Sequence, residues 1–529
     1  MNLAPVRRLR IAFVACAMFA TALPAAIAQE APIADTEYGQ VRGSIDEGVS
    51  VFLGIPYGAD TSTTRFQPPK KPASWDGVKD ALQYPDTTPQ VELAGALFAT
   101  WTPDPLPAQS ENMLGLNVWT PGLDDRKRPV MVWFHGGGFT AGSGSSTTFQ
   151  GTNLANRGDV VVVTVNHRLN GLGYLDLTSI TDDPLYADSG NVGNLDMVAS
   201  LEWVRDNIEN FGGNPENVLI FGESGGGAKV STLLAMPEAQ GLIDRAVVQS
   251  GSMLKGRTPE EAAKDTAAFM EVMGADSLED LLAATPEDFV EAFRAGSSNP
   301  EININYGPVV DNRSLPRDPF APDAPQTAID VPMLIGTNET EASLFLMADP
   351  SVFEITDADI PARLAPFMED PAQAETLTSA YRDLRPELSS TDLLFAIASD
   401  LMFERPAFIQ ASRKAEQGGA PVWIYHFDWA TPVMDGKIGS LHALEIPFAF
   451  DTLEHSASMI GDTDAPQIVA DQMSEAWISF ARFGDPNARG LPFWPAFDTE
   501  SRAFMRINTE SEVDTDYFED EEAILSTLD

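Results

Sequence analysis

The residue pattern with the clearest chemical meaning in this chain is a Gly-x-Ser-x-Gly motif that runs from Gly222 to Gly226, with Ser224 at its centre. An apolar run at 217–221 precedes the motif, and a segment of helical character at 228–236 follows it. A strand, this motif and a helix in succession make a sharp turn that lifts the serine hydroxyl clear of a sheet. The pattern alone arises often by chance, so a nucleophilic role for Ser224 needs support from other residues.

A serine nucleophile needs a histidine that accepts its proton, an acid that orients the histidine, and N–H groups that stabilise the oxyanion. The chain has only five histidines, so the base is the most restrictive choice. Four of them fit poorly. His135 and His167 precede the serine, although the base should follow it. His426 lies inside an expected strand, and His455 follows no strand.

His442 is the histidine whose position suits a base. It lies in a loop at 439–445 that follows an expected strand at 422–427. In proteins with a parallel sheet between helices, the site gathers where the strands end, at their carboxyl edge. We therefore predict that His442 accepts the proton of Ser224.

Two acidic residues are placed where they could orient this histidine. Glu339 and Glu341 both follow an expected strand at 331–335, again at the carboxyl edge of the sheet. A glutamate in this place can also favour the dipole of a following helix, without any catalytic role. The spacing by itself does not choose between the two residues.

A run of three glycines after His135 is suited to bind an oxyanion. The run follows an expected strand at 129–134, the place from which hydrolases of this kind donate backbone N–H groups. Only glycine lets a backbone come so close to a substrate and turn its amides inward. We predict donors at Gly137 and Gly138, joined by the N–H of Gly225 after the nucleophile.

The rest of the chain predicts the scaffold that brings these groups together. Short β-rich segments come first, and strands then alternate with helical segments such as 196–210. The alternation indicates an α/β fold with a large, mostly parallel sheet and an antiparallel N-terminal portion. Two helical insertions, 259–293 and 357–415, are expected over the site, with a loop at 98–105 as a pocket wall. The expected strands are 39–41, 49–53, 116–120, 129–134, 160–166, 218–221, 245–249, 331–335 and 422–427.

Composition limits the partners of the protein. The 529 residues include 33 basic and 78 acidic ones, which gives a net charge of −45. A surface this acidic repels nucleic acid and anionic membranes, so neither is expected as a partner. Adaptation to salty surroundings and ordinary solubility charge both explain the excess, and the oligomeric state is left open.

The first 28 residues are predicted to be a signal peptide. Three arginines precede an apolar stretch at 11–23, and small residues at 26–28 form a cleavage site. Cys16, the only cysteine, lies inside this segment, so the mature chain has no disulfide and no cysteine metal site. We expect an exported bacterial protein, periplasmic or secreted, with residues 29–529 forming a single domain.

The order of these and further motifs resembles the type-B carboxylesterase family. That family includes bacterial esterases, cholinesterases and some lipases, and the resemblance extends over nearly all of residues 29–529. It implies an α/β-hydrolase fold and a serine esterase that needs neither a metal nor a cofactor. The matching segments are 52–57, 65–66, 110–118, 166–169, 190–191, 211–215, 221–226, 249–252, 336–341, 442–447 and 494–495.

The resemblance also implies roles for individual residues. It assigns the acid to Glu341 and leaves Glu339 without a catalytic role. It further matches Ser224 to the nucleophile, His442 to the base, Gly137, Gly138 and Gly225 to the oxyanion donors, and Ser250 to a position near the acid and the histidine. We also expect a supporting role for Glu223, the residue before the serine.

Two residues depart from the family pattern. Met113 stands where the family usually has a cysteine, so the usual disulfide is absent and its loop must be held by packing or be mobile. Gly225 replaces the usual alanine after the nucleophile. This change is expected to open slightly more room and to leave the N–H donor intact.

The implied function is the hydrolysis of small-molecule carboxylic esters through an acyl-enzyme on Ser224. A lipase that acts on longer-chain acylglycerols is the nearest alternative, and amides or bulky aromatic esters remain open as substrates. A non-catalytic binding protein of the same fold is the alternative from another class. The intact set of Ser224, Glu341 and His442 argues against it.

Overall fold

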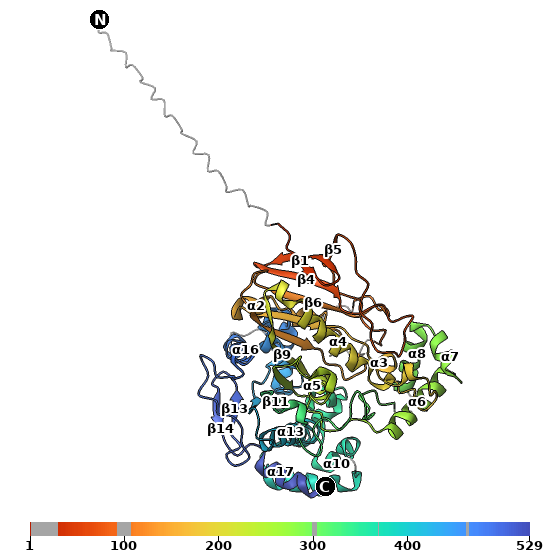
Figure 1. The fold of residues 1–529 in the computed structure, drawn as a ribbon. Coiled ribbons are helices and arrows are strands. Elements are labelled where there is room, and N and C mark those ends of the chain that lie inside the picture. The colour runs from red at the N-terminus through yellow and green to blue at the C-terminus, as the bar shows by residue number, and fades with distance from the viewer. Residues whose placement is uncertain (2–29, 92–106, 299–303, 369, 462–464, 529) are drawn as a thin grey trace.

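The computed structural model of the protein describes residue 1 and residues 30–91, 107–298, 304–368, 370–461 and 465–528 (Figure 1). The expected signal peptide, 1–28, therefore lies outside the described residues except for Met1. The expected pocket wall at 98–105 lies outside them as well. Within the described ranges, no helix is long and apolar enough to cross a bilayer.

An eleven-stranded sheet forms the centre of the molecule, in the order β14-β13-β12-β11-β10-β9-β7-β8-β6-β4-β3. Strands β7 to β13 pair with one another in parallel. Strands β3, β4 and β6 at one end of the sheet, and β14 at the other, pair antiparallel with their neighbours. The predicted parallel sheet with an antiparallel N-terminal portion is confirmed. The strands are β3 (Ser44–Asp46), β4 (Val49–Pro56), β6 (Gly115–Thr120), β7 (Arg128–Phe134), β8 (Val161–Val165), β9 (Gly213–Glu223), β10 (Arg245–Gln249), β11 (Met333–Asn338), β12 (Val422–Phe427), β13 (Phe504–Ile507) and β14 (Glu512–Asp514).

A separate three-stranded sheet lies at the N-terminal end of the described chain. It consists of β1 (Ile33–Thr36), β2 (Gly39–Arg42) and β5 (Val78–Asp80). The expected strand 39–41 thus belongs to this small sheet, and the other eight expected strands belong to the large one.

The central strands are mainly apolar because both faces of the large sheet are covered. Strand β7 shows the arrangement, since its alternate side chains belong to two different cores. Val130, Val132 and Phe134 pack in one core, and Met131 and Trp133 pack in the other. All five side chains are fully buried.

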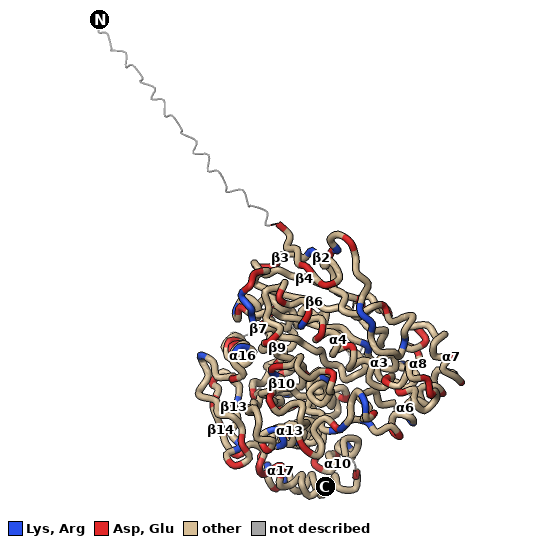
Figure 2. The backbone as a smooth tube through the Cα atoms, in the orientation of Figure 1, with Lys and Arg blue, Asp and Glu red and all other residues tan. Residues whose placement is uncertain are grey.

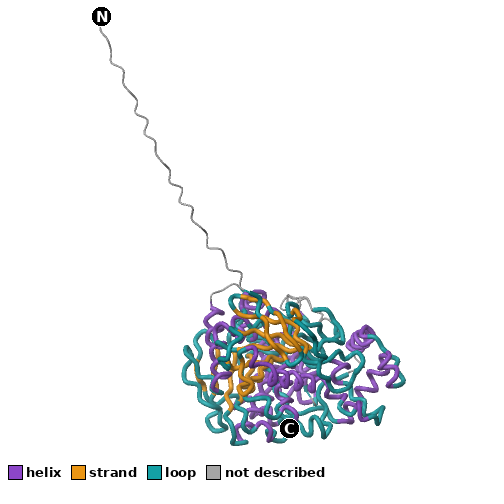
Figure 3. The backbone as a smooth tube through the Cα atoms, turned by 45° about the horizontal axis from the view of Figure 1, so that its top comes forward, coloured by secondary structure: helices purple, strands orange, loops and turns teal. Residues whose placement is uncertain are grey.

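Helices cover the two faces of the large sheet (Figures 1 and 3). One face carries α4 (Val192–Asn207), α5 (Gly225–Leu233) and α13 (Arg405–Glu416), whose apolar residues join the first core. The other face carries α2 (Thr152–Gly158) and α16 (Ala465–Phe483), whose apolar residues join the second core. Among the residues that the structure describes, acidic positions are spread over strands, helices and loops and do not gather in one patch (Figure 2).

The two expected insertions are helical. The first contains α6 (Pro259–Met273), α7 (Leu278–Ala283) and α8 (Pro286–Ser298), which group at one side of the molecule (Figure 1). Its apolar residues form a third core with Phe66, Phe139 and Tyr174. The second contains α10 (Ile360–Leu364), α11 (Ala374–Leu384), α12 (Ser390–Ser399), a π-helical turn at Asp400–Glu404, and α13.

Candidate active site

Ser224 occupies a strained turn between β9 and α5. Its backbone has φ 57° and ψ −122°, a conformation that residues other than glycine seldom adopt. The turn is held because the Ser224 N–H donates to the carbonyl of Gln249 at 2.9 Å and the Ser224 carbonyl accepts from the Ala228 N–H at 3.0 Å. Ser224 is half-buried, whereas Glu223 before it and Gly225 after it are buried. The predicted sharp turn is therefore present, with the serine as the accessible residue.

Two glycines of the motif are required by the tightness of this turn. A Cβ atom on Gly222 would stand 2.6 Å from the carbonyl carbon of Gly226 and 2.6 Å from the carbonyl oxygen of Phe134. A Cβ atom on Gly226 would stand 2.0 Å from the same Phe134 oxygen. No real side chain fits at either position, so both must be glycine.

His442 and Glu341 are in direct contact. The His442 Nδ1 atom lies 2.6 Å from Glu341 Oε2, and both residues are buried. Glu341 Oε1 in turn accepts a hydrogen bond of 2.8 Å from the N–H of Asn338, the last residue of β11. The contact joins the loop after β11 to the loop before α14 (Ile446–Phe450).

The structure distinguishes the two glutamates that spacing had left open. Glu341 is fully buried against His442. Glu339 is exposed, and its backbone N–H pairs with the carbonyl of Phe427 on β12. Only Glu341 is therefore placed to orient the imidazole through Nδ1.

The second nitrogen of His442 faces another carboxylate. Nε2 lies 3.1 Å from Glu223 Oε1, and it forms no hydrogen bond with any described residue. Burial lowers the pKa of His442, but Glu223 and Glu341 outweigh it and raise the pKa to about 9. Burial raises the pKa of Glu223 to about 8, although His442 opposes the rise. The structure thus brings Nε2 close to the residue before Ser224, and it shows no hydrogen bond between Nε2 and Ser224 itself.

Two aromatic rings surround His442 on its other sides. The centre of the imidazole lies 4.7 Å from the ring centre of Phe403, in the π-helical turn, and 5.1 Å from that of Phe345. Phe403 thus packs on the imidazole from a π-helical turn, a type of structure that often occurs at functional sites. Neither phenylalanine drew attention in the sequence, since nothing local links it to His442.

The three-glycine run lies against the turn of Ser224. We call residues 135–138 the glycine loop. Gly137 and Gly138 have φ angles of 86° and 64°, and the Gly137 carbonyl accepts from the Ala141 N–H at 3.2 Å. A Cβ atom on Gly225 would stand 2.5 Å from the nitrogen of Gly138 and 2.2 Å from its carbonyl oxygen. The glycine loop and the start of α5 therefore meet directly at these two residues.

The expectation that Gly225 opens extra room was wrong. The space that an alanine methyl group would occupy is filled by the backbone of Gly138. Glycine at position 225 lets the glycine loop come closer, and it leaves no cavity behind.

A buried polar network behind His442 was missed by the sequence reasoning. Glu445 accepts a hydrogen bond of 2.7 Å from the side chain of Asn338 and one of 3.1 Å from Gln249. Asn338 also donates to the carbonyl of Leu441 at 2.8 Å. These contacts fix the loops that carry Glu341 and His442 relative to each other. The one available sequence signal was the position of Glu445 three residues after His442.

Ser250 lies next to this network without a side-chain partner there. Its N–H donates to the carbonyl of Gly336 at 2.8 Å, and its backbone has φ 47°. The hydroxyl is buried and forms no hydrogen bond with any described residue. No hydrogen bond joins it to Glu341 or His442 within the described part of the chain.

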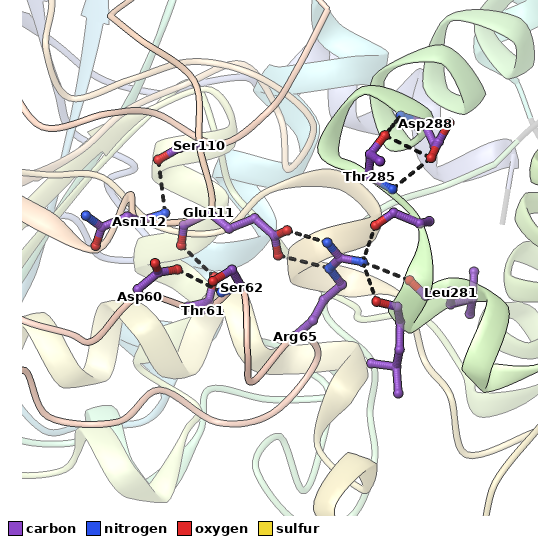
Figure 4. A network of polar contacts seen from close by, with 12 residues as sticks. Asp60, Thr61, Ser62, Arg65, Ser110, Glu111, Asn112, Leu281, Thr285 and Asp288 are labelled. Atoms are coloured by element: carbon purple, nitrogen blue, oxygen red, sulfur yellow. Dashed lines mark hydrogen bonds and ion pairs between the residues drawn. The ribbon is translucent and has the colours of Figure 1, made fainter.

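An ion pair holds the segment that lacks the usual disulfide (Figure 4). Arg65 forms a buried pair with both carboxylate oxygens of Glu111, close to the buried Met113. The same guanidinium donates to the carbonyl oxygens of Leu281 at 2.9 Å and Ala284 at 2.8 Å. Arg65 therefore ties the segment before β6 to the end of α7, so this part is held by polar contacts as well as packing.

Comparison with known proteins gives the family of the chain. Residues 30–524 match the carboxylesterase family. The chain belongs to the carboxylesterase family. This protein is 37% identical to the para-nitrobenzyl esterase of Bacillus subtilis, over 92% of this chain and 96% of that protein. It is 31% identical to the phenmedipham hydrolase of Pseudarthrobacter oxydans, over 90% of this chain and 95% of that protein.

Solved structures give the same result for the fold. The crystal structure of a Geobacillus stearothermophilus carboxylesterase matches with a TM-score of 0.80 at 38% identity, over 93% of this chain and 99% of that one. This carboxylesterase thus has the α/β-hydrolase fold and is a carboxylic-ester hydrolase, as its sequence predicted.

Proposed function

We propose that this carboxylesterase works through a triad of Ser224, His442 and Glu341. The observation that carries the proposal is the 2.6 Å contact between His442 Nδ1 and Glu341, which leaves Nε2 without a hydrogen bond next to the serine turn. Glu341 holds the imidazole in the tautomer that has its free lone pair on Nε2. That lone pair is the one a general base needs.

The reaction proceeds in two acyl-transfer steps. His442 takes the proton of Ser224 as its hydroxyl attacks the ester carbonyl, and Glu341 stabilises the imidazolium that forms. The imidazolium then protonates the leaving alcohol, and an acyl-enzyme remains on Ser224. Water repeats the sequence with the same base and releases the acid.

The N–H groups of Gly137, Gly138 and Gly225 stabilise the oxyanion of each tetrahedral intermediate. The contact between Gly138 and Gly225 supports this role because it puts donors from two segments side by side. Loss of one such donor typically lowers kcat by a factor of about 10² to 10³.

Glu223 and Ser250 support the triad in this proposal. Glu223 faces His442 Nε2 at 3.1 Å, so its charge favours the imidazolium. Ser250 directly follows β10, its hydroxyl is buried, and its N–H pairs with the carbonyl of Gly336 on β11. Among substrates we favour small-molecule esters over long-chain acylglycerols, in keeping with the names of the two bacterial relatives.

Export through a cleaved peptide at residues 1–28 is part of the proposal, with residues 29–529 as one catalytic domain. The arginine-rich start, the apolar stretch and the small residues at 26–28 support it. N-terminal sequencing of the protein recovered from the periplasm and the medium tests this part. A mature chain that keeps residue 1 would contradict it.

The central test replaces Ser224 with alanine. Ser224→Ala should lower kcat on p-nitrophenyl esters by about 10⁶-fold, while the protein stays folded. Ser474→Ala is a matched control, because the hydroxyl of that buried serine donates to the carbonyl of Ala470 inside α16. This variant should keep full activity. Full ester hydrolysis by Ser224→Ala would overturn the mechanism. A panel of acyl chain lengths with wild-type protein separates an esterase from a lipase.

A further inference from the structure

The glycine loop and the turn of Ser224 are in close contact at several residues. A Cβ atom on Gly136 would stand 3.0 Å from the carbonyl oxygen of Glu223 and 2.9 Å from its side-chain Oε2. Together with the contacts of Gly225 and Gly226, this leaves no room for a Cβ atom at any of these three glycines. The distance between the predicted oxyanion donors therefore depends on whatever holds the backbone of the loop.

One side chain of α5 holds that backbone. Lys229 is 0% exposed, and its Nζ atom donates a hydrogen bond of 2.8 Å to the carbonyl oxygen of His135. The ammonium also lies 5.7 Å from the ring centre of Phe139. Because His135 and Phe139 flank the three glycines, Lys229 contacts both ends of the run.

The residue that receives this hydrogen bond is itself fixed. The ring of His135 stacks on that of His167, with 4.9 Å between ring centres and 9° between planes. Its Nδ1 atom lies 2.8 Å from the carbonyl oxygen of Gly136. Burial, with the nearby Lys229 charge, holds the pKa of His135 well below its usual range, so the ring stays neutral. The start of the glycine loop is thus anchored through both its ring and its carbonyl.

Keeping an ammonium in this place is costly. Burial lowers the pKa of Lys229 to about 7, and Glu223 offsets only part of that effect. Lysine is almost never fully buried unless it has a partner, and an apolar side chain would fill the same space at lower cost. The hydrogen bond from Nζ to the carbonyl oxygen of His135 is the contact that an apolar side chain could not replace, since the amine keeps an N–H donor whether it is charged or neutral.

Position 225 complements this contact. The glycine loop can approach α5 as closely as it does only because residue 225 has no Cβ atom, which would meet Gly138 at 2.2 Å. Lys229 lies one turn of helix further along α5. One residue therefore draws the loop toward α5, and the other makes the space for it.

We propose that Lys229 and Gly225 act together as a clamp that sets the position of the glycine loop over α5. Lys229 is then a positioning residue for the oxyanion donors and does not touch the substrate. The inference rests on the proposed function, because it assumes that Gly137, Gly138 and Gly225 hold the oxyanion.

The first experiment compares two buried lysines. Lys414 on α13 is a matched control: it is also 0% exposed, and its ammonium donates to the carbonyl of Ala328 at 2.7 Å and that of Ile329 at 3.0 Å. Lys229→Met should lower kcat roughly ten- to a hundredfold, since small displacements of catalytic groups have effects of that size, and KM should change less than about threefold. Lys414→Met should lower Tm without changing kcat. Equal kcat values for wild type and Lys229→Met would overturn the proposal.

A second lysine variant covers the outcome in which Lys229→Met does not fold. Glutamine has about the length of methionine but keeps an N–H donor. Lys229→Gln should therefore be more active than Lys229→Met by at least about threefold if the hydrogen bond to His135 sets the position of the loop. A folded Lys229→Gln that is no more active than Lys229→Met, or that loses more than about a hundredfold in kcat despite its donor, would contradict the clamp.

A double-mutant cycle tests the link between the two residues. Gly225→Ala alone should lower kcat by roughly ten- to a hundredfold, because its methyl group displaces Gly138. In the Lys229→Met background the loop is already released, so the same alanine should cost less than about threefold. Effects that simply multiply would show that the two positions act separately, which would overturn the clamp.

Ser224→Ala in the same assays separates this inference from the proposed function. An inactive Ser224→Ala with a fully active Lys229→Met would reject the clamp and keep the triad. An active Ser224→Ala would reject the proposed function, and the clamp with it. Binding of an aryl trifluoromethyl ketone, which forms a tetrahedral adduct with a serine nucleophile, should weaken in parallel with kcat in Lys229→Met. Unchanged binding of this analogue would argue against a role at the oxyanion.

Discussion

Two histidines of this protein each lie between two carboxylates, yet only one of them lies beside the turn of Ser224. His442 contacts Glu341 at 2.6 Å and Glu223 at 3.1 Å. His426, on β12, contacts Asp428 through a short hydrogen bond and Glu404 at 3.5 Å. Burial opposes a charge on both rings, but the neighbouring carboxylates raise the pKa of His442 to about 9 and that of His426 to about 10.

The carboxylates around the two histidines differ in what else they bind. Asp428 also accepts a hydrogen bond of 2.7 Å from Arg506, and Glu404 accepts one from the hydroxyl of Thr337. Both acids beside His426 therefore have further polar partners, one an arginine and the other a threonine hydroxyl. His442 instead has a nitrogen without a hydrogen bond in the described structure, next to the turn of Ser224. The chemistry of a catalytic base requires this free position beside a nucleophile, and a histidine with two acids is not sufficient.

The largest effect should come from replacing each histidine with glutamine. His442→Gln should lower kcat/KM by about 10⁵- to 10⁶-fold, because it removes the proposed base that accepts the serine proton. His426→Gln should keep kcat/KM within about threefold of wild type and lose about 3 kcal/mol of unfolding free energy, since two buried acids lose their partner. Ester hydrolysis and urea unfolding measure the two quantities. A comparable loss of activity in both variants would remove the distinction between the two sites.

The acids should differ in the same way, with a smaller effect. Glu341→Gln keeps the shape of the side chain but removes the charge that stabilises the imidazolium, so kcat should fall by about 10³- to 10⁴-fold. Asp428→Asn, the matched change beside His426, should lower Tm and leave kcat nearly unchanged. If Glu341→Gln kept wild-type kcat, another acid would have to orient His442.

Glu223 should act on the pH dependence more than on the maximal rate. Neutral His442 is the active form, so activity rises with pH as its proton is lost, and the raised pKa of His442 puts this rise in the alkaline range. Glu223→Gln removes the largest carboxylate contribution to that pKa and should move the rise to lower pH. The measurement is kcat/KM from pH 5 to 10 in wild type and variant. A rise that stays in place, or moves to higher pH, would contradict the role of Glu223.

How far the sequence predicted this molecule depends on the range of the interactions. Strands 245–249 and 422–427 agree in full with β10 and β12, because buried parallel strands are local apolar runs. Helix α5 begins at Gly225 and not at 228, since the strained backbone of Ser224 turns directly into the helix. Strands β13 and β14 were not predicted, because they are short and lie at the edge of the sheet.

The candidate site shows the same limit. Glycines and the serine motif were visible because their backbone demands act over a few residues. Glu445 was invisible as a structural residue because its partners, Asn338 and Gln249, lie 107 and 196 positions away. Lys229 carries no local pattern either, since its carbonyl partner on His135 is 94 positions distant. Contacts of this range come from the fold, and one sequence does not encode them in a readable pattern.

The smallest effect concerns how the stability of the protein depends on pH. The pKa of His426 is raised to about 10 in the folded state, well above the ordinary value of 6.5 that it regains on unfolding. A raised pKa contributes stability that is fully present below about pH 6.5 and is lost as pH rises through the folded value. Unfolding free energy should therefore decline between about pH 7 and pH 10 in wild type, and this decline should be shallower in His426→Gln. His455→Gln, a change in a more exposed histidine, is the control that should keep the wild-type slope. If His426→Gln left the pH dependence of the unfolding free energy unchanged, the carboxylates around His426 would hold this histidine without favouring its charge. The sites of His426 and His442 would then differ in electrostatics as well as in access to a nucleophile.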